Sequence, residues 1–190
     1  MVYSAVRNST APVRNLRCIA SRVTAAACAT LMLTLSPGFA ATKTEKTFGA
    51  WLVSCIENGG KKSCSLVKKL QAPKTRRVAF VWAVGVDKQG HYVNSLAVPT
   101  GIAVKPGIHL AIGGKDVAVA FRLCTPQVCA ASLPMDTATE QALNSGNPIA
   151  VKFVLANGRM VKANVDTKNF PDAYSYLKSE LGTAAEMAGH

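Results

Sequence analysis

The alternation of hydrophobic and polar residues after residue 47 predicts a chain made mostly of β-strands. Short runs of β-branched and aromatic residues recur between turn residues about every ten positions, which is typical of an antiparallel sandwich or barrel. We expect strands at Phe48–Cys55, Cys64–Leu70, Val78–Val86, Asn94–Val98, Ile108–Ile112, Val117–Leu123, Val128–Leu133, Ile149–Ala156 and Arg159–Val165. The pattern therefore predicts an all-β fold, an antiparallel β-sandwich, forming a single domain over residues 41–190.

Two of the turns have a distinctive chemistry. Gly113-Gly114 favours a tight hairpin, and Asn157-Gly158 is a preferred pair for a two-residue type I′ turn. Alternation in the strand before Asn157 places Val151, Phe153 and Leu155 on one face and Lys152 on the other. We expect the apolar face to meet the core.

Two short helices are also expected. Thr137–Asn144 follows Asp136, a favourable N-cap, and stops before Gly146. Pro171–Leu181 has proline in its first turn and stops at Gly182. The residues from about 183 onward are expected to form a loose tail.

The first forty residues have the organisation of a signal peptide. Four arginines occur without any acidic residue, an apolar stretch follows from Val23 to Leu35, and small residues lie at Gly38 and Ala40. A stretch of this length is too short to span a bilayer, which needs roughly 20 apolar residues. We therefore expect residues 1–40 to be a cleaved export signal, and the protein to reach the periplasm, the outer membrane surface or the exterior.

Net charge suggests the kind of partner. Subtracting the four arginines of the signal from 22 basic residues leaves 18, against 10 acidic ones. An exported basic protein favours anionic surfaces such as lipopolysaccharide or an anionic glycan over nucleic acid. The alternative is that the net charge merely keeps the protein soluble.

Four cysteines remain after the signal is removed: Cys55, Cys64, Cys124 and Cys129. An even number in an exported chain indicates disulfides rather than a zinc site. We favour Cys55 with Cys64 and Cys124 with Cys129, because each pair brackets its own turn and facing hairpin positions meet disulfide geometry. The crossed pairings remain open at this point.

Catalytic and metal-binding motifs are not apparent. Histidine occurs only at His91, His109 and His190. Carboxylates are sparse, and four of them lie in or next to inferred turns and caps: Asp87, Asp116, Asp136 and Glu140. We recognise no nucleophile elbow, zinc-protease motif or phosphate-binding loop, so we expect no enzyme activity, cofactor or metal. Trp51 and Trp82 lie in apolar strands and are expected in the core.

The most unusual stretch is basic. Lys61, Lys62, Lys68, Lys69, Lys74, Arg76 and Arg77 fall between Glu57 and Asp87 with no acidic residue among them. Successive residues of a strand point to opposite faces, so Lys68 and Lys69 cannot share one patch. If the two connections that carry the other residues project from the same end of the sandwich, they form an anion-binding or partner-binding patch of Lys61, Lys62, Lys68, Lys74, Arg76 and Arg77. A solvated basic face is the alternative.

The ordered motifs resemble a known family. They are Phe48-Gly49-Ala50-Trp51-Leu52-Val53-Ser54-Cys55, then Cys64, the stretch from Leu96 to Ile108, and Phe121-Arg122-Leu123-Cys124 followed by Cys129. This order is similar to that of the invasion-associated locus B proteins of Gram-negative bacteria, over about Phe48 to Leu177. The resemblance implies a β-sandwich protein of the periplasm or outer surface that is associated in some pathogens with entry into host cells.

The sequence thus favours a non-enzymatic envelope or surface protein that contacts an anionic or protein partner, with a contribution to host-cell interaction or invasion. Two alternatives stay open. In the first, the chain is a periplasmic accessory protein of envelope maintenance. In the second, it is an unrecognised glycan hydrolase. The second would require two carboxylates about 5–10 Å apart in a cleft.

Overall fold

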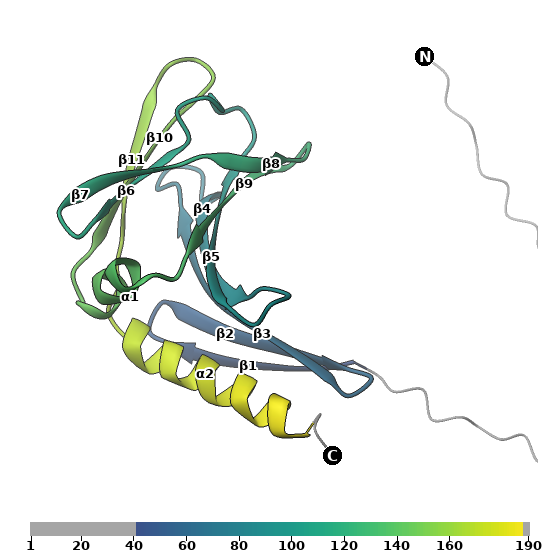
Figure 1. The fold of residues 1–190 in the computed structure, drawn as a ribbon. Coiled ribbons are helices and arrows are strands. Elements are labelled where there is room, and N and C mark those ends of the chain that lie inside the picture. Colours follow the sequence, from purple (N-terminus) through teal and green to yellow (C-terminus); the bar gives the residue numbers. More distant parts are fainter. Residues whose placement is uncertain (1–40, 188–190) are drawn as a thin grey trace, which may run out of the picture. The chain divides into compact units, whose positions relative to one another are not determined.

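The structure is a computed structural model that describes residues 41–187. In this part of the chain, eleven strands form two antiparallel sheets (Figure 1). The large sheet has the order β1-β2-β3-β4-β5-β9-β8 and the small sheet the order β11-β10-β6-β7. The large sheet contains β1 (Thr42–Phe48), β2 (Trp51–Asn58), β3 (Lys61–Gln71), β4 (Val78–Val86), β5 (Tyr92–Pro99), β8 (Phe121–Cys124) and β9 (Val128–Pro134). The small sheet contains β6 (Ile108–Ile112), β7 (Lys115–Val119), β10 (Ile149–Val154) and β11 (Met160–Val165). The expected antiparallel β-sandwich is therefore the observed fold class.

The core lies between the inward faces of the two sheets. Alternate residues of β4 and β5, such as Trp82 and Leu96, are completely buried, as are Leu110 of β6 and Val151 of β10. This two-residue alternation is the one read from the sequence, and it turns one face of β4, β5, β6 and β10 toward the core. Trp51 and Trp82 are both fully buried, as expected.

Two helices complete the structure. Helix α1 (Thr137–Asn144) has the predicted bounds, and Asp136 caps it by accepting a hydrogen bond from the backbone N of Thr139 at 2.8 Å. Helix α2 (Phe170–Met187) packs on β1, β2 and β3 and follows them along the large sheet in Figure 1. It is not short, because it continues past Gly182 for five residues, so the expected loose tail is helical as far as Met187. One glycine costs a helix only about 1 kcal/mol, and the alanines that follow it favour helix.

Two strands were divided wrongly from the sequence. The predicted strand at Phe48–Cys55 is broken by a tight turn at Gly49-Ala50, and an additional strand, β1, precedes that turn. Its sequence shows no apolar alternation because β1 is an edge strand, and its first six residues are exposed. The predicted strand at Val117–Leu123 is also two strands, since the chain leaves the small sheet at Val119 and joins the large sheet at Phe121.

The β10–β11 hairpin differs from its prediction by one residue. The backbone N of Leu155 donates to the carbonyl of Arg159 at 2.8 Å, so the loop holds three residues, 156–158, and not two. Gly158 adopts the left-handed region with φ of 81°, the conformation that closes this longer loop. The consequence is a register in which Lys152 faces Lys162, whereas a two-residue turn would have placed Ala163 opposite Lys152.

The predicted signal peptide, residues 1–40, lies outside the described residues. Within the described part of the chain, no helix is both long and apolar enough to cross a membrane.

Candidate functional site

Two disulfides staple strands of the large sheet. Cys55 of β2 is joined to Cys64 of β3, and Cys124 of β8 is joined to Cys129 of β9. In each pair the two cysteines face each other directly across neighbouring strands. This is the local pairing that the intervening turns favoured on sequence grounds.

The basic stretch of the sequence does not form one patch. Strand β3 contains eleven residues, which at about 3.3 Å per residue separates its ends by more than 30 Å. Lys61 and Lys62 lie where β3 begins, whereas Lys74, Arg76 and Arg77 lie in the connection that follows its other end. The expectation that both connections project from the same end of the sandwich is therefore wrong, because β3 runs the length of the sheet between them.

Lys68 does not belong to any surface patch. Only 5% of the residue is exposed, and its Nζ lies 5.7 Å from the centre of the Trp51 ring. Trp82 faces it directly on the neighbouring strand. Burial lowers the pKa of the Lys68 ammonium, and the nearby Asp166 carboxylate opposes that shift. This lysine faces the interior and cannot bind an external anion, which corrects its assignment as a partner-binding residue.

Lys62 is likewise occupied, because its ammonium forms an ion pair with Glu180 of α2. That contact joins the β2–β3 hairpin to the C-terminal helix and lowers the pKa of the Glu180 carboxyl. Lys61 remains exposed at the turn beside it. In the first half of the basic stretch, Lys62 and Lys68 therefore make contacts within the fold, whereas Lys61 and Lys69 are exposed.

The second half of the stretch is presented by a well-defined loop. The backbone N of Arg76 donates to the carbonyl of Ala72 at 2.9 Å, and the N of Ala72 donates to the carbonyl of Arg77 at 2.8 Å. Arg76 has φ of 57°, a left-handed conformation that is uncommon for a residue with a side chain. Lys74, Arg76 and Arg77 are all exposed on this loop.

Neighbouring loops add further cations to the same end of the sandwich. The backbone N of Ala103 donates to Val154 at the end of β10, and the N of Ala156 donates to Gly101, so the 100–107 loop lies against the β10–β11 hairpin. These two loops carry the exposed residues Lys105 and Arg159. We call the five side chains the cationic loop end: Lys74, Arg76, Arg77, Lys105 and Arg159.

A hollow opens at the cationic loop end between the two sheets. Arg77 and Arg159 both line it, and its remaining lining is mainly apolar and includes Val78, Pro99 and Leu155. None of the three loops that carry the five cations contains Asp or Glu. No ion pair joins any of these five cations to a carboxylate of residues 41–182. Their charge is therefore available to an external anion.

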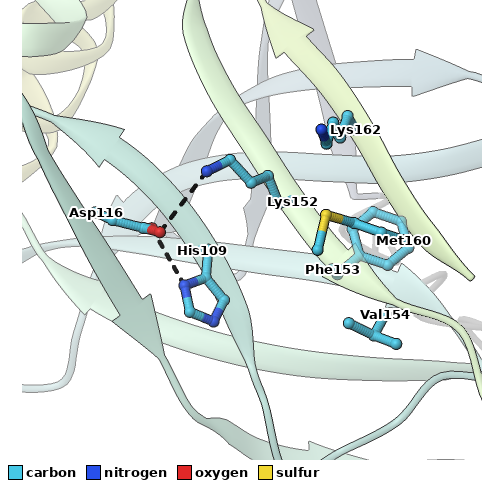
Figure 2. A pocket seen from close by; sticks show the side chains of 7 residues that line it. All are labelled: His109, Asp116, Lys152, Phe153, Val154, Met160 and Lys162. Atoms are coloured by element: carbon cyan, nitrogen blue, oxygen red, sulfur yellow. Dashed lines mark hydrogen bonds and ion pairs between the residues drawn. The ribbon is translucent and has the colours of Figure 1, made fainter. Parts of the chain in front are cut away.

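A second hollow lies on the outer face of the small sheet, where Asp116 of β7 holds two basic side chains (Figure 2). Nδ1 of His109 lies 3.1 Å from one oxygen of Asp116, and Nζ of Lys152 lies 3.7 Å from the other. The three groups come from three different strands, β7, β6 and β10. The three residues are not neighbours in the sequence, and only the sheet register brings them together.

The lining of this second hollow limits its chemistry. It contains one carboxylate, Asp116, and no serine, threonine or cysteine for His109 to activate. It therefore lacks both the carboxylate pair of a typical glycosidase and the nucleophile of a hydrolytic triad. Across residues 41–182, no cluster of three metal-binding side chains is formed. The arrangement suits binding by charge better than catalysis.

The fold and these surfaces together define a disulfide-stapled β-sandwich with five exposed cations at one end. Residues 51–178 match the model of the invasion associated locus B family, and the chain belongs to that family. It is 27% identical over 122 residues to Invasion protein B of Bartonella bacilliformis, an alignment covering 63% of this chain and 64% of that relative. The crystal structure of invasion associated protein B from Bartonella henselae has the same fold, with a TM-score of 0.64 and 22% identity, covering 74% of this chain and 98% of that one.

Proposed function

We propose that this chain is an exported, non-catalytic envelope or surface protein that binds a polyanionic partner through the cationic loop end. The observation that carries the proposal is the gathering of five exposed cations on three loops that contain no carboxylate. Unpaired cations of this kind attract anions over distances comparable to the Debye length, about 8 Å at physiological salt. The family name and the Invasion protein B relative support a role in contact with host cells.

The partner best suited to this surface carries several phosphate or sulfate groups. Arginine guanidinium groups bind both groups through two parallel hydrogen bonds, and Arg76, Arg77 and Arg159 contribute three such groups. Lipopolysaccharide offers phosphates in the envelope of the producing cell, and sulfated glycans offer sulfates on a host surface. The first would make the protein an envelope accessory, and the second would make it a host-contact protein.

The test compares two pairs of charge removals at opposite ends of β3. Arg76→Gly with Arg77→Ser removes two charges from the cationic loop end, and Lys61→Ser with Lys88→Ser removes two from the other end. Glycine at position 76 also relieves the left-handed backbone, so the first variant should fold as well as the parent. Retention is measured on immobilised heparin and on immobilised lipopolysaccharide over a salt gradient.

We expect the first variant to elute at clearly lower salt and the second to elute close to the parent. Stronger retention on lipopolysaccharide than on heparin would favour the envelope role, and the reverse would favour host contact. Equal elution of the two variants on both columns would contradict the proposal, because the loops would then have no particular part in binding.

A further inference from the structure

Three basic side chains form a row across the outer face of the small sheet. Lys152 of β10 faces Lys162 of β11 on one side and His109 of β6 on the other. All three line the same hollow, so they point to the same face (Figure 2). We call them the basic row. Neighbouring strands lie about 4.8 Å apart, and like charges directly opposite one another destabilise a sheet.

The row is only partly compensated. Asp116 serves Lys152 and His109 together, and it is the one carboxylate in the lining of the hollow. Lys162 forms no ion pair with the side chains described here, and it is exposed. An anionic group placed beside Lys162 would therefore relieve a repulsion that the folded chain leaves in place.

An apolar pair lies next to the basic row. Val154 and Met160 face each other on the same two strands, two residues from Lys152 and Lys162, and they line the same hollow. Met160 is 57% exposed. A flexible thioether on an open surface adapts to varied partners. The outer face of the small sheet thus offers two subsites, two residues apart along β11. Lys162 suits an anionic group, and Met160 suits an apolar group.

Strand β11 is also an open edge. It has β10 on one side and no strand of residues 41–187 on the other. Edge strands are usually protected from pairing with another chain by charged residues, bulges or short length. Edge strand β1 carries three charged residues, β8 is four residues long and contains a bulge, and β7 carries two charges in five residues. Strand β11 has six residues and a single charge, Lys162, and is the least protected of the four.

We propose that β11 receives an extended acidic segment of a partner protein as an additional strand of the small sheet. Main-chain hydrogen bonds to the free edge provide affinity, and side chains on the outer face provide selectivity. The segment carries Asp or Glu beside Lys162 and an apolar residue beside Met160, two positions away. This surface is separate from the cationic loop end and uses different residues, so it does not depend on the function proposed above.

The experiment uses a capped nonapeptide whose odd positions alternate between glutamate and valine and whose even positions are threonine, so that glutamate and valine lie two residues apart on one face. The control nonapeptide has lysine in place of each glutamate. Affinity is measured by titration calorimetry for the parent, for Lys152→Ser with Lys162→Ser, and for Lys88→Ser with Lys168→Ser. The last variant removes the same charge from exposed positions elsewhere. Amide hydrogen exchange of β11 is followed with and without the peptide.

We expect the acidic peptide to bind the parent and the Lys88/Lys168 variant alike, and to bind the Lys152/Lys162 variant at least tenfold more weakly. Exchange of β11 amides should slow on binding, because a new strand occupies the free edge. Unchanged β11 exchange, equal affinity for all three proteins, or equal binding of the lysine peptide would each overturn the proposal. A loss of heparin and lipopolysaccharide binding on changing Arg76 and Arg77 bears only on the cationic loop end.

Discussion

The indole Nε1 of Trp82 donates a hydrogen bond of 2.8 Å to Oδ1 of Asn94, and both residues are completely buried. Trp82 lies on β4 and Asn94 faces inward from β5, so this polar contact is located within the hydrophobic core. The amide of Asn94 also donates to the carbonyl of Pro134 on β9, at 3.4 Å. A single polar side chain thus links three neighbouring strands from the inside.

Replacing Asn94 by leucine should lower the free energy of unfolding by about 1–3 kcal/mol, because it leaves the indole N–H of Trp82 buried without an acceptor. Urea denaturation followed by tryptophan fluorescence measures the change. Adding Trp82→Phe to Asn94→Leu removes the orphaned donor, so the double variant should lose less than the sum of the two single losses. Strict additivity would show that the hydrogen bond contributes little.

Replacing Lys68 by methionine should raise the free energy of unfolding by about 1 kcal/mol at neutral pH, since it removes a charge buried beside Trp51 and keeps the volume. Burial lowers the pKa of Lys68 in the folded state below its unfolded value near 10.4. Between those two pKa values the unfolded chain binds more protons, so the parent gains stability as pH rises.

The Lys68→Met variant should lack this alkaline gain. Stability measured at several pH values from 7 to 10.5 tests the expectation. Lys69→Met is the matched control, because Lys69 is the adjacent residue of β3 and is exposed. A parallel alkaline response in the parent and in Lys68→Met would show that the buried ammonium is not the source.

The two disulfides should differ in their resistance to reduction. Cys55, Cys64 and Cys129 are buried, whereas Cys124 is exposed on the edge strand β8. A thiol reagent should therefore open Cys124–Cys129 first under native conditions. Replacing either pair by serine should cost about 2–3 kcal/mol in the chain-entropy description of such short loops.

Peptide mapping of partly reduced, alkylated protein identifies which cysteines react first. Mapping of the unreduced protein should link Cys55 to Cys64 and Cys124 to Cys129. A peptide containing Cys55 joined to Cys124 would contradict the sheet register itself.

The cap of α1 should make part of the stability sensitive to acid. Hydrogen bonds from Thr139 hold the pKa of the Asp136 carboxyl below its usual value. A carboxyl with a lowered folded pKa stabilises the fold above its unfolded pKa, and this contribution is lost as pH falls through the folded value. Asp136→Ala should lose about 1 kcal/mol at pH 7.

Asp136→Asn should keep most of the cap at pH 7, because asparagine caps helices well, and should no longer respond to acid at this position. Thermal unfolding between pH 2 and 7 distinguishes the variants. Asp172→Asn, which removes a carboxylate from the first turn of α2, serves as the control for the loss of charge alone. If the parent were more stable than Asp136→Ala by the same amount at pH 2 as at pH 7, this account of the cap would be contradicted.

The sequence was most informative where local chemistry alone decides the structure. Alternation located most strands because one face of each is buried, and Asp136 located the start of α1 because its side chain bonds the first turn. Gly113-Gly114 forms the expected two-residue turn, with both glycines at positive φ. These features depend on residues close together in the chain.

The parts that were missed depend on register and on distances across the sheet. One additional residue in the loop after β10 moved Lys162 to the same face as Lys152 and created the basic row. The length of β3 separated Lys61 from Arg76, although they are close in sequence. Lys68 carries a charge that normally indicates a surface position, yet strand alternation places it beside Trp51 in the interior. Register and distance across the sheet are not set by local sequence, and the residue type of Lys68 does not indicate its burial.

The crossing at Ala120 has a mechanical consequence. One residue separates β7, at an edge of the small sheet, from β8, at an edge of the large sheet. Any sliding of one sheet over the other would pull directly on this link, and the Cys124–Cys129 bridge ties the far end of β8 to β9. We therefore expect the two layers to resist shear and to melt together as one cooperative unit.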